Sequence, residues 1–276
     1  MTLCVAWRNQ KDEVHFASDS RYTLATNSYA DVGIKVLSLP LTILNPADGN
    51  DAGTRSAYFT SELGMCFAGS AINSLAVKDS IVEALKSLQF IPGHTDTSMA
   101  GIANFIFTAY RIISKQVCAT ALGENGRANI LVGGMCHASG RVRVFQLSTD
   151  MQNRHSVEEV LVLPGHVFVG SGEQAARENL IDEETGDLSY LCALKGVIDD
   201  PQVPSVGGHI QYGRFNASRF VVYGIVGFDE PDAPFPRQVH YWRGALDLNS
   251  EEFLKGHGSF FPGVPYINPF TVVGGF

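Results

Sequence analysis

The chain has 276 residues, of which 45% are hydrophobic and 17% are charged, so it can build a large core and is neither disordered nor fibrous. Its net charge of −8 argues against non-specific nucleic-acid binding, which requires a basic surface. The longest apolar runs, such as Val221–Phe228, are too short to span a bilayer, and the first residues lack the basic and apolar regions of a signal peptide. We therefore expect a cytoplasmic protein.

The first half of the sequence predicts short strands followed by two helices. Alternating and β-branched runs predict strands, and apolar residues at helical spacing predict helices. A polar loop, Asn45–Arg55, is rich in Asn, Asp and Gly, which favour turns. In order we expect a hairpin of Thr2–Trp7 and Val14–Ala17, a strand Ile34–Leu39 closed by Pro40, a strand pair Tyr58–Thr60 and Met65–Ala68, a helix Ala71–Leu88 and a helix Ser98–Leu122. The second helix is apolar on more than one face, which is typical of a buried helix.

The second half predicts four strands, two helices and two further strands. Blocks of this kind favour an α+β fold over strictly alternating α/β. We expect one domain over residues 1–228 and an irregular arm, rich in Pro, Gly and aromatic residues, over residues 229–276 that packs on it. The expected elements are strands Ile130–Val132, Val142–Leu147, Val157–Leu163 and Val167–Val169, helices Glu173–Ile181 and Leu188–Ile198, and strands His209–Phe215 and Arg219–Phe228.

Thr2 combines two catalytic groups if Met1 is removed, and a methionine before a small residue favours that removal. The threonine then carries a hydroxyl nucleophile and a free α-amine. An α-amine has a pKa of roughly 7.7–8.0, which is close enough to neutral for it to accept the hydroxyl proton. One residue then supplies both nucleophile and base. Taken alone, Thr2 is an ordinary second residue.

Asp19 and Lys35 are two charged residues that can assist Thr2 in catalysis. Asp19 ends the return strand of the predicted hairpin, and antiparallel pairing brings the ends of a hairpin together. Lys35 lies on the next predicted strand, which can run alongside. An ammonium there favours a deprotonated hydroxyl and an uncharged amine on Thr2, while Asp19 holds and orients the ammonium. Either charge alone is an ordinary strand-end residue.

Several collinear segments resemble the proteasome β-subunits and the HslV-type proteases. The matches cover residues 2–228, and the Met-Thr-x-Cys-Val opening is most similar to the bacterial proteasome-like group called Anbu. The matching segments are Thr-Leu-Cys-Val at 2–5, Phe-Ala-Ser-Asp-Ser-Arg-Tyr-Thr at 16–23, Ile-Lys-Val at 34–36, Cys-Phe-Ala-Gly-Ser-Ala at 66–71, Val-Gly-Ser-Gly at 169–172 and Ser-Val-Gly-Gly at 205–208.

The resemblance implies a four-layer αββα sandwich and a set of site residues. Thr2 would be the nucleophile, Asp19 and Lys35 its electrostatic support, and Gly69 the donor of a backbone N–H to the oxyanion. Ser171 would hydrogen-bond near the Thr2 amine. The remaining implied site residues are Ser205 and Asp200 as catalytic partners, Phe67 and Ala71 as the apolar wall of the substrate pocket, and Arg21 and Thr23 on the substrate side, where the family has a structural Arg and a substrate-contacting Thr.

The sequence also departs from the family pattern. The interval between Lys35 and Gly69 holds a polar loop that ordinary β-subunits lack. Asp199 and Asp200 precede Ser205 by more than the usual spacing, so the late acid is assigned to Asp200 on weaker grounds. The glycine that usually precedes the catalytic threonine is absent, so activation would need only the loss of Met1.

The resemblance implies a threonine peptidase that acts on peptides or unfolded proteins inside a self-compartmentalising homo-oligomer, with a regulatory ATPase or adaptor as a candidate partner. Two alternatives remain open at this stage. One is a non-catalytic structural or adaptor subunit, against which the joint presence of Thr2, Asp19 and Lys35 argues. The other is a small-molecule amidohydrolase or acylase of the same fold, with the loop at 45–57 narrowing the site.

Other motifs favour no cofactor and no metal. Gly170–Ala175 fits a G-x-G-x-x-A dinucleotide motif, but the acidic run 182–187 follows where that fold requires a strand. Ser171 lacks the first glycine of a G-x-S-x-G elbow. The five cysteines form no C-x-x-C pair, which is typical of reduced thiols in a reducing compartment. The eight histidines lack ligand spacing, so we predict that each is a surface or a satisfied core histidine and not a ligand.

Overall fold

The computed structural model of the chain describes residues 2–25, 28–46, 55–120, 122–180, 186–229, 237–244, 246–248, 250–256 and 263–268. The helices are α1 (Ala71–Leu85), α2 (Met99–Ala119), α3 (Glu173–Glu178), α4 (Asp187–Asp199) and α5 (Glu251–Gly256), with a 3-10 helix η1 (Gly123–Gly126). The strands are β1 (Leu3–Arg8), β2 (Val14–Ser18), β3 (Tyr22–Ala25), β4 (Ser28–Ala30), β5 (Val36–Leu44), β6 (Ala57–Gly69), β7 (Leu88–Gln89), β8 (Ala128–Cys136), β9 (Arg141–Thr149), β10 (His155–Val160), β11 (Gly165–Gly170), β12 (Gln211–Asn216), β13 (Arg219–Asp229), β14 (Arg237–Trp242), β15 (Leu246–Asp247) and β16 (Tyr266–Ile267).

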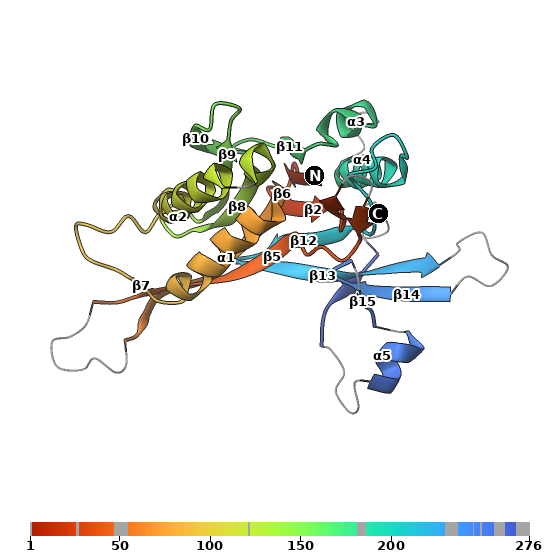
Figure 1. Ribbon diagram of the computed structural model, residues 1–276. Helices are drawn as coiled ribbons and strands as arrows, with labels where there is room; N and C mark the ends of the chain where they lie inside the picture. The colour runs from red at the N-terminus through yellow and green to blue at the C-terminus, as the bar shows by residue number, and fades with distance from the viewer. Residues whose placement is uncertain are drawn as a thin grey trace.

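The chain folds as a mixed α/β protein around a large sheet, whose strand order in the described residues is β10-β9-β8-β6-β13-β12-β2-β1-β11. Its two halves meet where β13 runs parallel to β6, at the pair Arg219 and Glu62. Helices α1 and α2 lie over β5, β6, β8 and β9, and α3 and α4 lie by β1 and β11 (Figure 1). The β1–β2 hairpin therefore lies in the half of the sheet that α4 covers.

Three apolar clusters follow from the alternation of side chains along the buried strands. Leu3, Val5 and Trp7 of β1 pack with the apolar side of α4, whereas Cys4 and Ala6 face the strands of the other half. Alternation on β6 works in the same way, with Met65 and Phe67 under α1 and α2 and Cys66 and Ala68 facing β1. Because these strands are buried on both faces, their sequences are continuously apolar.

Serine caps begin the two long helices at the predicted positions. The hydroxyl of Ser70 accepts from the N–H of Asn73 at 3.3 Å at the start of α1. Ser98 accepts from Gly101 at 3.2 Å at the start of α2. Each cap satisfies one of the amide groups that the first turn of a helix leaves unpaired. Of the helices that the structure describes, none combines the length and the apolar character needed to cross a bilayer.

The predicted strands at Ile34–Leu39 and at 58–68 are wrong in their extent. β5 begins at Val36 and continues through Pro40 to Leu44, paired with β6 in that stretch. Proline is tolerated there because its missing N–H can face the side without a partner strand. β6 is one strand of 13 residues instead of a strand pair. Its polar middle stays in the sheet, with Ser61 and Glu62 paired to β5, and Gly64 leaves room for the ring of Phe220, which a Cβ would meet at 2.6 Å.

Two other expectations also need correction. Helix α2 buries one face only, since Phe105 and Ile112 are 40% and 53% exposed. The arm after residue 229 is more regular than predicted, because β14 pairs antiparallel with β13 and β16 adds parallel to it. Residues 47–54 of the predicted polar loop, Met1, and most of the prolines of the arm lie outside the described residues.

Candidate active site

Thr2 lies buried at the start of β1, where four chain segments meet. The backbone of Leu3, the next residue, pairs with the end of β2: its carbonyl accepts from the N–H of Asp19 at 3.3 Å, and its N–H donates to Asp19 Oδ1 at 3.1 Å. On the other side, the carbonyl of Thr2 accepts from the N–H of Ser171 at 3.0 Å. Antiparallel pairing in the hairpin thus brings Thr2 and Asp19 together as the sequence predicts.

Asp19 and Lys35 form an ion pair with no exposed surface on either side chain. Lys35 Nζ donates to Asp19 Oδ1 at 2.8 Å and to the carbonyl of Arg21 at 2.5 Å. Asp19 Oδ2 accepts from the N–H groups of Arg21 at 3.1 Å and Gly207 at 3.2 Å. Both carboxylate oxygens are therefore satisfied, which a charge in a water-free interior requires.

Gln211 holds this pair from the first position of β12, and sequence reasoning missed it. Its Oε1 accepts from the backbone N–H of Lys35 at 2.9 Å, and its Nε2 donates to the carbonyl of Gly33 at 2.5 Å and to that of Asp19 at 3.4 Å. The side chain is 2% exposed. A glutamine at the start of an apolar strand gives no sequence signal, because its partners lie about 176 residues away.

Arg21 joins the end of β2 to the loop that carries Ser205. Its guanidinium makes two hydrogen bonds to Asp31, at 2.7 and 2.9 Å, and one to the carbonyl of Pro204 at 3.2 Å. The hydrogen bonds from Arg21 lower the pKa of the Asp31 carboxyl. A Cβ on Gly207 would lie 2.2 Å from the guanidinium carbon, so a larger residue there would displace the Arg21 side chain. Arg21 thus links the end of β2 to the Ser205 loop, and its implied role stays a prediction.

Ser171 and Ser205 lie side by side next to Thr2. Their hydroxyls are 2.9 Å apart, although 34 residues separate them in the sequence. Gly170, before Ser171, has φ +116°, and a Cβ on it would lie 1.9 Å from the carbonyl oxygen of Thr2. Only glycine permits this approach of β11 to β1. The two predicted serines are thus brought to the end of β1.

Gly69 ends β6 beside this group. It has φ +91°, and a Cβ on it would lie 2.6 Å from the carbonyl oxygen of Arg127, the residue before β8. Ala71 follows as the first residue of α1. Phe67, however, is 1% exposed and packs beneath α1 and α2. Alternation along β6 turns its side chain toward the helices, so its predicted place on the wall of the substrate pocket stays a prediction.

Asp200 and Thr23 lie at the edge of this arrangement. Asp200 follows α4, and its Oδ1 accepts from the N–H of Gln202 at 2.8 Å, so the carboxylate stabilises its own turn. That local bond does not bring it to Ser205 as a catalytic acid. The interval between Asp200 and Ser205, which is longer than the usual family spacing, already indicated this in the sequence. Thr23 is exposed on the small β3–β4 sheet.

Two buried thiols lie behind the site. The Cys4 thiol donates to the carbonyl of Phe67 at 2.7 Å, and so connects β1 to β6, and its Sγ also lies 3.1 Å from Ser18 Oγ. Burial raises the pKa of the Cys66 thiol well above its usual value, and the neighbouring Cys4 raises it further. Both side chains have no exposed surface. The Cys66 thiol is therefore a protonated packing group, and Cys4 packs beside it.

Comparisons with solved structures find the same fold, although no family model and no curated protein matches the sequence. Anbu (ancestral β-subunit) from Yersinia bercovieri aligns over 80% of this chain and 86% of its own, with 16% identity and a TM-score of 0.54. A Gly-1 mutant of Anbu from Hyphomicrobium sp. strain MC1 aligns over 92% and 91%, with 16% identity and a TM-score of 0.55. The Anbu complex of Pseudomonas aeruginosa, described as a helical assembly, aligns over 92% and 90%, with 15% identity and a TM-score of 0.52. The resemblance found in the sequence is thus confirmed at the level of the fold, and this chain has the fold of the proteasome-like Anbu proteins.

Proposed function

We propose that this protein is a threonine-type peptidase of the N-terminal-nucleophile class, in which removal of Met1 frees the α-amine of Thr2. The observation that carries the proposal is the fully buried Asp19–Lys35 pair, which is anchored to the backbone next to Thr2. A buried ammonium has no structural need at a strand end, because an apolar pair would fill the same space at lower cost. A role in stabilising negative charge on Thr2 explains why it is there.

The chemistry follows in two steps. The α-amine of Thr2 accepts the hydroxyl proton, and the oxygen attacks the carbonyl carbon of a peptide bond. The N–H of Gly69 stabilises the oxyanion of the tetrahedral intermediate. The amine of the product leaves with the proton, and an ester on Thr2 remains. Water, deprotonated by the same α-amine, then hydrolyses the ester and regenerates the threonine.

Ser171 and Ser205 support the amine in this proposal. Their hydroxyls form one hydrogen-bonded pair beside the backbone of Thr2. A hydroxyl can donate or accept, so the pair can hold the α-amine in either protonation state. We assign them a positioning role and assign Asp200 none, since its carboxylate is engaged by Gln202.

The proposed architecture is the four-layer αββα sandwich of N-terminal-nucleophile hydrolases, with residues 1–228 as the catalytic domain and 229–276 as an extension. The three apolar clusters support it, because two lie under helices and the third holds side chains from both halves of the sheet. We also propose a homo-oligomer that encloses the site and admits unfolded chains. The helical assembly described for the Pseudomonas Anbu complex supports an assembled state.

A Thr2→Ala variant tests the proposal. We expect wild-type protein to hydrolyse an unstructured protein such as casein, and the variant to lose at least about 10³-fold in rate, as for removal of a nucleophile. Thr60→Ala is the matched control, since Thr60 is exposed on β6. Full activity in Thr2→Ala would overturn the proposal. Cleavage of small acyl amides without any cleavage of casein would replace the peptidase with an acylase.

A further inference from the structure

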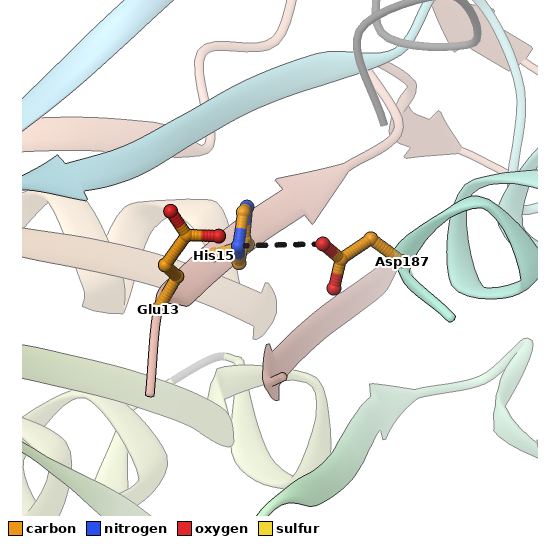
Figure 2. Close-up of side chains that lie close together, drawn as sticks. All are labelled: Glu13, His15 and Asp187. Carbon is orange, nitrogen blue, oxygen red and sulfur yellow. Dashed lines mark ion pairs between the residues drawn. The ribbon is translucent and has the colours of Figure 1, made fainter. Parts of the chain in front are cut away.

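A second polar cluster lies at the opposite end of the β1–β2 hairpin from Thr2. Glu13 precedes β2, His15 lies in β2, and Asp187 is the first residue of α4. One ligand atom of each residue lies within 4.8 Å of the other two. Figure 2 shows the two carboxylates on either side of the imidazole. At about 3.4 Å per strand residue, the cluster is roughly 17 Å from Thr2, so it is independent of the proposed catalysis.

The His15 ring is held so that one nitrogen faces the carboxylates. The residue is 1% exposed, and its ring stacks on Trp7 with centroids 4.8 Å apart and planes within 3°. Its Nδ1 lies 2.8 Å from the hydroxyl of Tyr212. With Nδ1–H donating to that hydroxyl, the lone pair of Nε2 points into the cluster, 3.9 Å from Asp187 Oδ2.

Both carboxylates are oriented by neighbouring donors. Trp7 Nε1–H donates to Asp187 Oδ1 at 2.7 Å, which leaves Oδ2 directed at the cluster. Asn9 Nδ2 donates to that Oδ2 at 2.9 Å and to Glu13 Oε2 at 2.8 Å. The Trp7 and Tyr212 contacts, which do not involve Asn9, form an outer layer of the kind that fixes the ligands of metal sites, including the hydrogen bond from the second nitrogen of a histidine.

The side-chain amide of Asn9 places a hydrogen-bond donor at the centre of the cluster. Its Oδ1 accepts from the N–H groups of Lys11 at 3.0 Å and Glu13 at 2.9 Å, which fixes the orientation of the amide. Nδ2 therefore faces the three acceptors, at 2.8 and 2.9 Å from the carboxylates and 3.5 Å from His15 Nε2. A positively polarised group already occupies the place that a cation would take.

We propose that Glu13, His15 and Asp187 bind a divalent transition-metal cation of the Zn²⁺ class, which displaces the amide nitrogen of Asn9. One imidazole and two carboxylates with water in the fourth position suit Zn²⁺, whereas Mg²⁺ and Ca²⁺ prefer all-oxygen ligands. The ion would join the turn of the hairpin to the first residue of α4, and so fix that helix on the sheet. Its role would be structural, because it lies far from Thr2.

The direct test is a titration of chelator-treated protein with Zn²⁺ and, separately, with Mg²⁺ by calorimetry, together with thermal unfolding. We expect one Zn²⁺ per chain, a higher Tm on binding, and no response to Mg²⁺. Glu13→Gln changes an exposed residue and should weaken Zn²⁺ binding at least tenfold without unfolding the chain. Asp187→Asn should do the same. His94→Gln, at an exposed histidine outside the cluster, is the matched control and should bind as wild type.

The Asn9→Asp variant distinguishes between two interpretations of the cluster: a metal site, and a polar cluster that needs no ion. The change adds a third carboxylate in place of the central donor. Without a metal, we expect the Tm to fall because like charges face one another. With Zn²⁺, we expect binding at least as tight as in wild type and recovery of the Tm. The proposal is overturned if wild-type protein takes up no Zn²⁺, if Glu13→Gln and Asp187→Asn bind it as well as wild type, or if Zn²⁺ fails to restore the Tm of Asn9→Asp.

Discussion

Asp19 and Lys35 neutralise each other inside the protein, and each depends on the other for its stability there. Removing one partner leaves an uncompensated buried charge, which costs about 3–5 kcal/mol. We expect Lys35→Met to lower the free energy of unfolding by this amount, measured by urea denaturation, and to abolish hydrolysis. Lys195→Met is the matched control, because Lys195 pairs with Asp199 at the surface and should cost far less. An equal loss in the two variants would contradict the account of the pair.

The reactivity of the thiols near Thr2 is a second prediction at the residue scale. Cys4 and Cys66 have no exposed surface, and burial raises the pKa of Cys66, whereas Cys192 is exposed. The thiolate is the reactive form, so we expect iodoacetamide to modify Cys192 in the folded protein and all five cysteines only after unfolding. Peptide mapping by mass spectrometry measures this. Rapid modification of Cys4 in the folded protein would make it a rival nucleophile.

At the residue scale, the sequence predicted the site where a short hairpin determines it. Thr2, Asp19 and Lys35 lie within the first 35 residues, and antiparallel pairing alone brings the first two together. Gln211 could not be found in this way, because its contacts with Lys35 and Gly33 depend on the order of distant strands. The resemblance names Phe67 as a pocket residue but does not show the face of β6 on which it lies, which is the face under α1 and α2.

At the scale of secondary-structure elements, the ends of the strands determine the positions of the site residues. β11 approaches β1 so closely that Gly170→Ala would place a Cβ 1.9 Å from the carbonyl of Thr2, at a φ that alanine adopts poorly. The variant must move Thr2 or β11, and a shift of about 1 Å at a catalytic group can cost about 10²-fold in rate. We expect that loss in kcat/KM for Gly170→Ala, with the stability followed by urea denaturation.

Gly140→Ala is the control for this substitution. Gly140 also has a positive φ, +63°, but no atom lies within 4 Å of its would-be Cβ. It should therefore carry the backbone strain of an alanine at positive φ, about 1 kcal/mol, without any loss of rate. Equal activity in the two variants would show that the approach of β11 to β1 does not position Thr2.

The elements themselves were predicted well where one periodicity dominates. The expected helix starts at Ala71 and Ser98 agree closely with α1 and α2, because serine caps precede strong helical patterns. The strands β5 and β6 were cut short, because Pro40 and the polar residues 61–62 read as breaks. Sequence alone does not show that β5 has an open side at Pro40, which is a property of the assembled sheet.

On the scale of the whole molecule, the outer face of the α1–α2 layer exposes three large apolar side chains. Ile72 on α1 is 62% exposed, and Phe105 and Ile112 on α2 are 40% and 53% exposed. A hollow of about 700 Å³ beside Ile112 is lined by Arg111, Ile112, Lys115, Cys118, Ala119, Asn153 and His155. Apolar surface of this kind marks contacts between proteins. It is the surface through which we expect the proposed homo-oligomer to form.

Light scattering after size exclusion tests this expectation. Wild-type protein should have a mass that is a multiple of one chain, and Phe105→Glu with Ile112→Glu should shift it toward the monomer, because charges at the centre of an interface are costly. Val162→Glu with Leu163→Glu is the control, as these residues are exposed in the β10–β11 connection. A wild-type monomer at micromolar concentration would contradict the proposed assembly.

The whole fold also creates a site that no local pattern indicates. His15 and Asp187 are 172 residues apart in sequence, and they meet only because α4 begins against the β1–β2 hairpin. Histidine spacing therefore predicted a structural role for His15. The resemblance, in contrast, predicted the overall fold well, because its motifs lie at strand ends and helix starts that the fold itself requires.

The central claim is that Thr2 acts as a free amino-terminal nucleophile, and one measurement addresses it most directly. The purified protein is analysed by intact mass before and after reaction with an epoxyketone, a threonine-directed electrophile, and the adduct is located by peptide sequencing. The account predicts a chain without Met1 that gains one adduct, on Thr2, and loses its activity in proportion. A chain that keeps Met1, or that still cleaves substrate while Thr2 stays unlabelled, would contradict it.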